Sequence, residues 1–121
     1  MSFNLVPANL VLLSELGSVA DGSKVRFLGC VDEYVVKTAT LRLTHDYPPS
    51  SVPRVAHVNI ELLLESIKRK EVDVGAWINV IGYVERRKEK GVFVQAIAVW
   101  DAGNVHPEAY GDAVMKRKDA E

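Results

Sequence analysis

Two long stretches of alternating apolar and polar residues each contain a glycine. Gly29 follows Val25 and Phe27 in the first stretch, and Gly82 lies within the second, which runs from Ala76 to Glu85. Alternation with a period of two is typical of β-strands. Glycine inside a strand marks a bulge or a barrel corner, because it lets the backbone bend sharply. The two glycines therefore favour a strongly coiled sheet.

The segments around these two stretches add more strands and one helical pattern. Alternation predicts strands over 35–44, 55–60 and 92–100. After the third strand, the apolar residues switch to the spacing i, i+3, i+4, i+7, which predicts a helix over 61–70. The members of this apolar stripe are Ile60, Leu63, Leu64 and Ile67.

The order of these elements indicates a fold class. A second helix is predicted from Pro107 to Lys118, since proline is well tolerated in the first turn of a helix. We therefore predict an all-β protein: a five-stranded OB-fold barrel with a helix between strands 3 and 4 and a C-terminal helix. A different α+β meander is the alternative.

The 121 residues are enough for one domain. We divide them into an N-terminal extension (1–22), the barrel (24–100) and the C-terminal helix (104–119). The longest apolar stretch is about ten residues, whereas a membrane span needs about 20, so no membrane association is expected. The single cysteine, Cys30, excludes an intrachain disulfide and fits a reducing compartment such as the nucleus or cytosol.

Motifs for catalysis are missing from the sequence. It contains no Gly-x-Gly, and therefore neither a dinucleotide-binding loop nor a phosphate-binding loop. The three histidines lack metal-ligand spacing, and one cysteine is too few for a structural zinc site. His45, beside Asp46, is interpreted as the start of a solvated loop, and Cys30 as a small barrel residue. We predict that the chain is not an enzyme and uses no cofactor or metal.

A set of basic and aromatic residues is a candidate surface for single-stranded nucleic acid. Cations can follow the phosphates of such a strand while aromatic rings stack on its bases. A solvated hairpin tip and core aromatics are the simpler interpretation of the same residues. The formal net charge of −1 predicts weak affinity for the isolated chain. The candidates are Lys37, Arg42, Arg54, Trp77, Arg86, Arg87 and Lys88.

The C-terminal helix is a candidate surface for a protein partner. Tyr110, Ala113, Val114 and Arg117 follow helical spacing, and Met115 flanks them. Gly111 interrupts the helix and costs about 1 kcal/mol relative to alanine. A helix this short is marginal alone and needs a surface to pack on. That surface is either its own barrel or a helix of a partner.

The ordered segments together resemble a known family. Residues 10–16 and 21–31, with Asp21-Gly22-Ser23 before the first strand, are similar to the smallest subunit, Ten, of the CST telomere-capping complex. The strands over 77–84 and 92–100 continue the similarity, which spans about residues 10–118. The small subunit of replication protein A is a more distant likeness.

This resemblance implies a function. It implies a non-catalytic subunit that heterodimerises with a Stn-type OB-fold subunit and, with a larger subunit, protects chromosome ends and supports telomere replication in the nucleus. The resemblance also implies that single-stranded telomeric DNA is bound mainly by the whole complex, and only weakly by the chain alone. The implied partner-binding residues are Arg26, Tyr110, Ala113, Val114, Met115 and Arg117. An autonomous protein that binds single-stranded nucleic acid is the alternative function.

Overall fold

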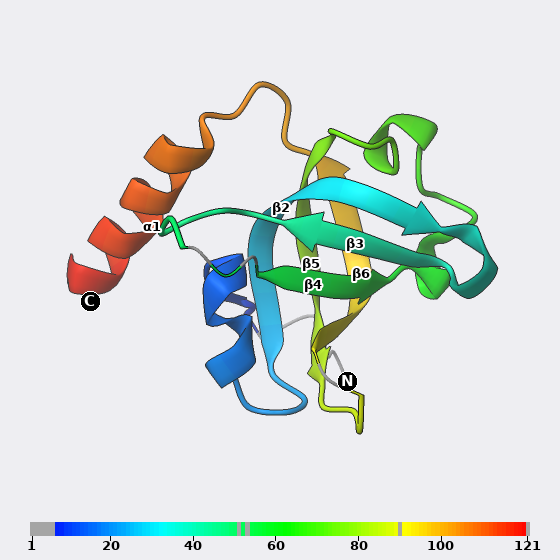
Figure 1. Ribbon diagram of the computed structural model, residues 1–121, viewed down its shortest axis with the longest axis horizontal. Coiled ribbons are helices and arrows are strands. Elements are labelled where there is room, and N and C mark those ends of the chain that lie inside the picture. The colour runs from blue at the N-terminus through cyan, green and yellow to red at the C-terminus, as the bar shows by residue number, and fades with distance from the viewer. Residues whose placement is uncertain (1–6, 51, 53, 90, 121) are drawn as a thin grey trace.

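Among the residues that the structure describes, five strands close into a barrel, a short sixth strand pairs with one of them, and the α-helix lies outside (Figure 1). The computed structural model describes residues 7–50, 52, 54–89 and 91–120. The strand order is β1-β2-β3-β4-β6-β5, and β2 also pairs with β5, which closes the ring. The strands are β1 (Asn9–Leu10), β2 (Lys24–Val35), β3 (Thr40–Thr44), β4 (Val55–Asn59), β5 (Trp77–Glu85) and β6 (Val92–Asp101). The helix is α1 (Pro107–Ala120).

Strand β2 serves two parts of the barrel. Its first half pairs antiparallel with β5, and its second half pairs antiparallel with β3. At Gly29, an added Cβ would lie 2.9 Å from Cβ of Leu43; at Gly82, it would collide with the backbone oxygen of Gln95. The β5–β6 register shifts between Ile81 and Gly82. The two glycines thus allow the close approach that closes the barrel, as the sequence predicts.

The N-terminal segment contributes to the packed structure. Strand β1 pairs parallel with the start of β2, and the 3₁₀ helix η2 (Leu13–Ser18) follows it. Leu13 and Leu16 are buried and belong to the core cluster. Residues 1–6 of the predicted extension lie outside the described residues. The fully buried side chains at the centre of the barrel include Val25, Phe27, Leu41, Val58, Ile78 and Val80.

The prediction of one continuous helix over 61–70 is wrong. The segment between β4 and β5 contains two single 3₁₀ turns, η4 (Glu61–Leu63) and η5 (Arg69–Glu71). Leu64 is exposed, so the apolar stripe does not reach the core along its whole length. The carboxylate of Glu71 accepts a hydrogen bond from the Lys68 backbone N–H at 2.9 Å, which starts a separate second turn.

The strand predicted over 35–44 is also divided. Strand β2 ends at Val35, the 3₁₀ turn η3 (Val36–Thr38) follows, and β3 begins at Thr40. Ala39 adopts a left-handed conformation, with φ of 51°, which reverses the chain between the two strands. Of the other four predicted strands, those over 55–60, 76–85 and 92–100 agree with the structure to within about a residue at each end, and the first lies within β2.

Candidate partner interface around the C-terminal helix

Helix α1 is attached to the β3–β4 loop by a tyrosine. The ring of Tyr47 lies directly on Gly111, where the Cβ of any other residue would collide with it. The Tyr47 hydroxyl donates a hydrogen bond to Oδ1 of Asp112 at 2.5 Å, and this bond raises the pKa of Tyr47. Gly111 is therefore the contact that lets the helix approach the loop, although it weakens the helix as a local structure.

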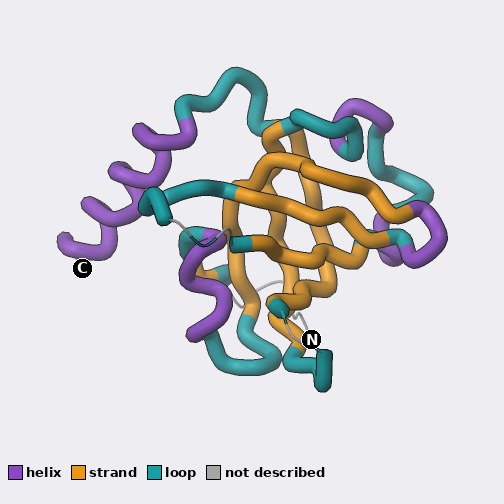
Figure 2. The backbone as a smooth tube through the Cα atoms, in the orientation of Figure 1, coloured by secondary structure: helices purple, strands orange, loops and turns teal. Residues whose placement is uncertain are grey.

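Two further contacts hold the ends of α1. At its start, Nε2 of His45 lies 3.1 Å from the backbone oxygen of Pro107, so the neutral ring donates through Nε2–H. At its end, Nζ of Lys118 donates to Oε2 of Glu15 at 2.6 Å. These two contacts tie the helix to the end of β3 and to η2. Figure 2 shows the helix lying at one side of the barrel.

His45 occupies the centre of an aromatic cluster under α1. Its side chain is 3% exposed, and its ring makes an edge contact with Trp77 and a tilted contact with Tyr110. Burial lowers the pKa of His45. The interpretation of His45 as a solvated loop residue is therefore wrong, because the returning helix covers it. In the sequence, His45 stands at the end of a strand and before a proline-rich loop. Nothing in that pattern indicates that a distant helix lies over the residue.

Two of the predicted partner residues face the barrel of their own chain. Val114 is 3% exposed, and Tyr110 is half-buried. Burial raises the pKa of Tyr110, and the nearby charge of Arg26 opposes that shift. Within the described part of the chain, the Tyr110 hydroxyl has no hydrogen-bond partner. Tyr110 and Val114 therefore fix the position of α1 against its own barrel.

The surface of α1 that faces away from the barrel is exposed. Ala113, Met115 and Arg117 are all solvent-accessible, and 40% of the Met115 surface is exposed. A groove of about 580 Å³ runs along the part of this surface that includes Ala113 and Met115, and a hollow of about 370 Å³ also touches Tyr47 and Met115. The groove is lined by Tyr47, Ala109, Asp112, Ala113, Met115 and Lys116.

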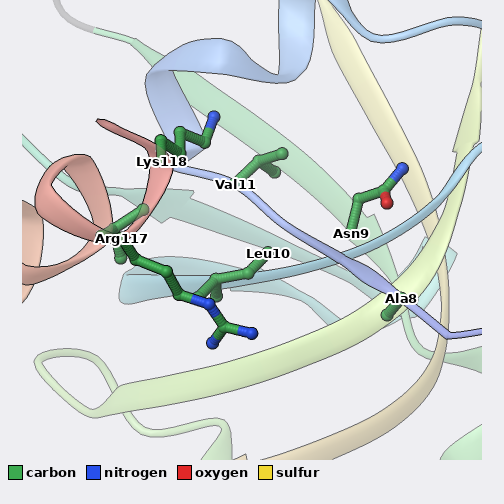
Figure 3. Close-up of a pocket in the computed structure, with 7 residues that line it drawn as sticks. Ala8, Asn9, Leu10, Val11, Arg117 and Lys118 are labelled. Atoms are coloured by element: carbon green, nitrogen blue, oxygen red, sulfur yellow. The ribbon is translucent and has the colours of Figure 1, made fainter. Parts of the chain in front are cut away.

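A second hollow of about 380 Å³ lies between β1 and the last turns of α1 (Figure 3). Arg117 extends from the helix towards Leu10 in that view. Leu10 pairs with Arg26 on β2, and the guanidinium of Arg26 lies 5.2 Å from the centre of the Trp100 ring. Arg117 therefore lines the hollow, and Arg26 is the register partner of Leu10, which also lines it. Val114 and Lys118 also line the hollow.

The predicted nucleic-acid residues do not form one groove. Trp77 lies under α1 beside His45, and Arg54 lines the hollow near Met115. Arg86 donates to the backbone oxygens of Gly17 and Val19, which fixes its side chain to the N-terminal segment. These three residues are thus separated from the others by the tertiary structure.

The remaining four predicted residues are exposed. Arg42 forms an ion pair with Asp32 at 3.1 Å, and Arg87 forms one with Glu85 at 2.9 Å. The other two are Lys37 in η3 and Lys88 in the β5–β6 hairpin. These exposed pairs neutralise part of the basic charge that the sequence alone suggested.

The described residues offer little for covalent or metal chemistry. No group of three or more His, Cys, Asp or Glu residues among them is close enough to hold a metal ion. Burial raises the pKa of Cys30, and the charge of Asp32 adds to this effect, so the reactive thiolate is disfavoured. No described helix is long and apolar enough to span a membrane.

A sequence comparison decides the family. The family model of Ten1, described as a telomere-capping, CST complex subunit, matches residues 1–116. This chain belongs to the Ten1 family. A curated relative, protein ten1 from Schizosaccharomyces pombe, is 31% identical over 111 residues, which is 92% of this chain and 94% of the relative. The resemblance in the sequence analysis is therefore confirmed.

Solved structures agree with the Ten1 assignment at the level of the fold. A chain of the S. pombe Stn1–Ten1 complex has a TM-score of 0.76 and 22% identity, with 99% of this chain and 100% of that chain covered. Telomere capping protein Ten1 from Saccharomyces pombe has a TM-score of 0.72 and 23% identity, with coverage of 93% and 99%. The predicted OB-fold class is thus confirmed.

Proposed function

We propose that this Ten1-family chain is a non-catalytic subunit that binds a Stn1-type OB-fold protein through the exposed side of α1. With that partner and a larger subunit, it caps single-stranded telomeric DNA in the nucleus. The observation that carries the proposal is the groove beside Met115, which lies on a helix already fixed to the barrel. The matched chain in the S. pombe Stn1–Ten1 complex supports the choice of partner.

The residues of α1 have different roles in this proposal. Ala109 and Ala113 lie one turn apart and are small, so a partner helix can approach the backbone closely. Met115 is flexible and apolar, which suits an adaptable contact. Tyr110 and Val114 act by packing on the barrel and fixing the position of the helix.

The charged residues Arg26 and Arg117 extend the proposed interface to the other side of α1. Both are exposed, and both lie beside β1. Arginine is favoured at interfaces because its planar group makes several directed hydrogen bonds while its stem packs on apolar surface. The two guanidinium groups would orient the partner, while the apolar groove supplies most of the affinity.

The test is a titration of the full chain with the Stn1-type protein of the same source. Met115→Glu should weaken binding at least tenfold, because a carboxylate would be desolvated in the groove. Leu62→Glu is the matched control. Leu62 is 67% exposed on η4 and does not line the groove, so its variant should bind within about twofold of wild type. An unchanged affinity for Met115→Glu would contradict the proposal.

A second function, autonomous binding of single-stranded nucleic acid, is favoured by the outer surface of β3, β4 and β6. That surface contains rings, amides and basic groups outside the α1 groove. The isolated chain should then bind an oligonucleotide with a dissociation constant tighter than about 100 μM at physiological salt, the weak end of non-specific binding. Weaker binding would contradict this second function and indicate that DNA is recognised only by the assembled complex.

A further inference from the structure

A serine is exposed where η2 ends and the loop to β2 begins. Ser18 and its neighbours Gly17 and Ala20 are all exposed. The Ser18 hydroxyl donates a hydrogen bond to the backbone oxygen of Glu15 at 2.9 Å, and this bond lies at the surface. A Cβ added at Gly17 would meet nothing within 4 Å, so the chain beside the serine is open. An approaching enzyme can therefore reach the Ser18 hydroxyl.

Acidic residues stand at equal distances on both sides of this serine. Glu15 lies three positions before Ser18, and Asp21 lies three positions after it. Ser18 is the only serine or threonine in the sequence that an acidic residue follows at this distance. Protein kinases select substrates partly by such charge patterns. An acidic residue after the serine suits a kinase whose substrate groove is basic.

Two arginines lie close to the same serine. The guanidinium of Arg86 donates to the backbone oxygens of Gly17 and Val19, which are the residues on either side of Ser18. Arg54 and Ser18 both line the hollow of about 370 Å³ described above, which we call the Ser18 hollow. Within the part of the chain that the structure describes, Arg54 forms no ion pair. Both guanidinium groups therefore have N–H donors available to a phosphate on Ser18.

We propose that Ser18 is a phosphorylation site for a kinase that requires an acidic residue three positions after the serine, and that Arg54 and Arg86 bind the resulting phosphate. Oγ of Ser18 forms a bond to the γ-phosphorus of ATP, while the bond from that phosphorus to the β–γ bridging oxygen breaks. ADP leaves with the electron pair of the broken bond, and the hydroxyl proton passes to the catalytic aspartate of the kinase.

The phosphate acts on the groove proposed for the Stn1-type partner. Tyr47 and Met115 line both that groove and the Ser18 hollow. Phosphoserine carries a charge of about −1.5 to −2 at pH 7. This charge must lose water when an apolar partner surface covers it, which opposes binding. Phosphorylation should therefore weaken association with the Stn1-type protein, a consequence that rests on the proposed function.

The first experiment incubates the full chain with ATP and a serine kinase of this acid-directed class, and maps the phosphate by mass spectrometry. Wild type should gain one phosphate on Ser18, and Ser18→Ala should gain none there. Asp21→Asn keeps the oxygen that accepts the backbone N–H of Arg86 but removes the charge, and should slow labelling about tenfold.

Ser66 is the matched control within the same chain. It is exposed like Ser18, but basic residues follow it at positions 68–70. A basic kinase groove repels these residues, so Ser66 should stay unlabelled. Absence of phosphate on Ser18, equal labelling of Ser66, or an unchanged rate for Asp21→Asn would overturn the assignment.

A second measurement tests the phosphate contact. The second pKa of phosphoserine, ordinarily about 6, is followed by the ³¹P chemical shift of the phosphorylated chain against pH. A nearby guanidinium lowers this pKa, because it favours the doubly charged form. Arg54→Gln should therefore raise the phosphate pKa. Arg42→Gln, at an arginine paired with Asp32, should leave it unchanged. Equal pKa values in wild type and Arg54→Gln would overturn the contact.

The last measurement is a titration of the phosphorylated chain with the Stn1-type protein. Phosphate on Ser18 should weaken binding about tenfold, whereas Ser18→Ala after the same kinase treatment should bind like unmodified wild type. Equal affinity of the phosphorylated and unmodified chains would overturn the control of binding. Met115→Glu in the unmodified chain separates the two proposals: its failure to weaken binding contradicts the groove, while the labelling and the ³¹P titration still decide the Ser18 site.

Discussion

Two surfaces of this Ten1-family chain are held in place in different ways. Helix α1 is positioned by side chains: Tyr47 on Gly111, His45 on Pro107, and Glu15 on Lys118. The outer surface of β3, β4 and β6 is positioned by backbone hydrogen bonds, since its residues lie in register on these strands. Side-chain attachments can be lost one at a time, whereas a strand ladder forms or melts as a unit.

This difference determines which kind of substitution disrupts each surface. A single substitution can move α1 and leave the barrel folded. A substitution on the outer surface of β3, β4 and β6 changes its chemistry but not its geometry, as long as the barrel remains closed. Variants that open the barrel should therefore abolish both surfaces, and variants that release the helix should affect only one.

The largest effect is expected for Gly82→Ala. Its Cβ would collide with the backbone of Gln95 and with Val94, and backbone at the centre of a barrel cannot move aside cheaply. We expect a loss of about 3 kcal/mol in the free energy of unfolding, measured by chemical denaturation. Gly17→Ala is the control, because nothing lies within 4 Å of its added Cβ, and its stability should stay near that of wild type. Equal stability of Gly82→Ala and wild type would refute the close approach.

The next effect separates the two surfaces. Gly111→Leu should displace the Tyr47 ring and alter the groove, so affinity for the Stn1-type protein should fall at least tenfold. Helix content measured by circular dichroism should not fall, because leucine favours the helix by close to 1 kcal/mol over glycine. Oligonucleotide binding should be unchanged. Parallel loss of both activities would show that the surfaces are coupled.

A smaller effect is expected at the end of α1. Lys118→Ala removes a partly exposed ion pair with Glu15, and such pairs contribute about 0.2–1 kcal/mol. The melting temperature should fall by a few degrees at most. Glu15 also accepts the backbone N–H of Leu12 at 2.8 Å, so Glu15→Ala should destabilise the chain more than Lys118→Ala. The reverse order would contradict the capping role of Glu15.

The smallest effect is a pH dependence from His45. Because burial lowers its pKa below the ordinary 6.5, the unfolded state binds a proton that the folded state excludes. The stability that this histidine contributes is therefore present above about pH 6.5 and is lost as the pH falls towards the folded-state pKa. Melting temperature should drop between about pH 7.5 and about pH 5.5, and the drop should be smaller in His45→Gln. An identical drop in melting temperature for wild type and His45→Gln would contradict a role of His45 in the pH dependence.

The sequence determined the local elements. Period-two alternation located the five strands of the ring but not the turn η3 between β2 and β3, glycines marked the bends, and Pro107 marked the start of α1. The family likeness also followed from sequence order. The segment over 61–70 is the local exception: Leu64 completed a helical stripe in the sequence, yet only part of that stripe meets the core. Period alone cannot show how much of a stripe has a surface to pack against.

Only the tertiary structure decided which residues meet. Phe93, in the strand predicted over 92–100, stacks on His57, because β4 and β6 become neighbours only when the barrel closes. Gly111 reads as a helix defect until Tyr47, 64 positions earlier, rests on it. Trp77 and Arg87, grouped by residue type, are placed in separate parts of the barrel. Long-range pairing is invisible to local patterns, since it depends on how distant strands align.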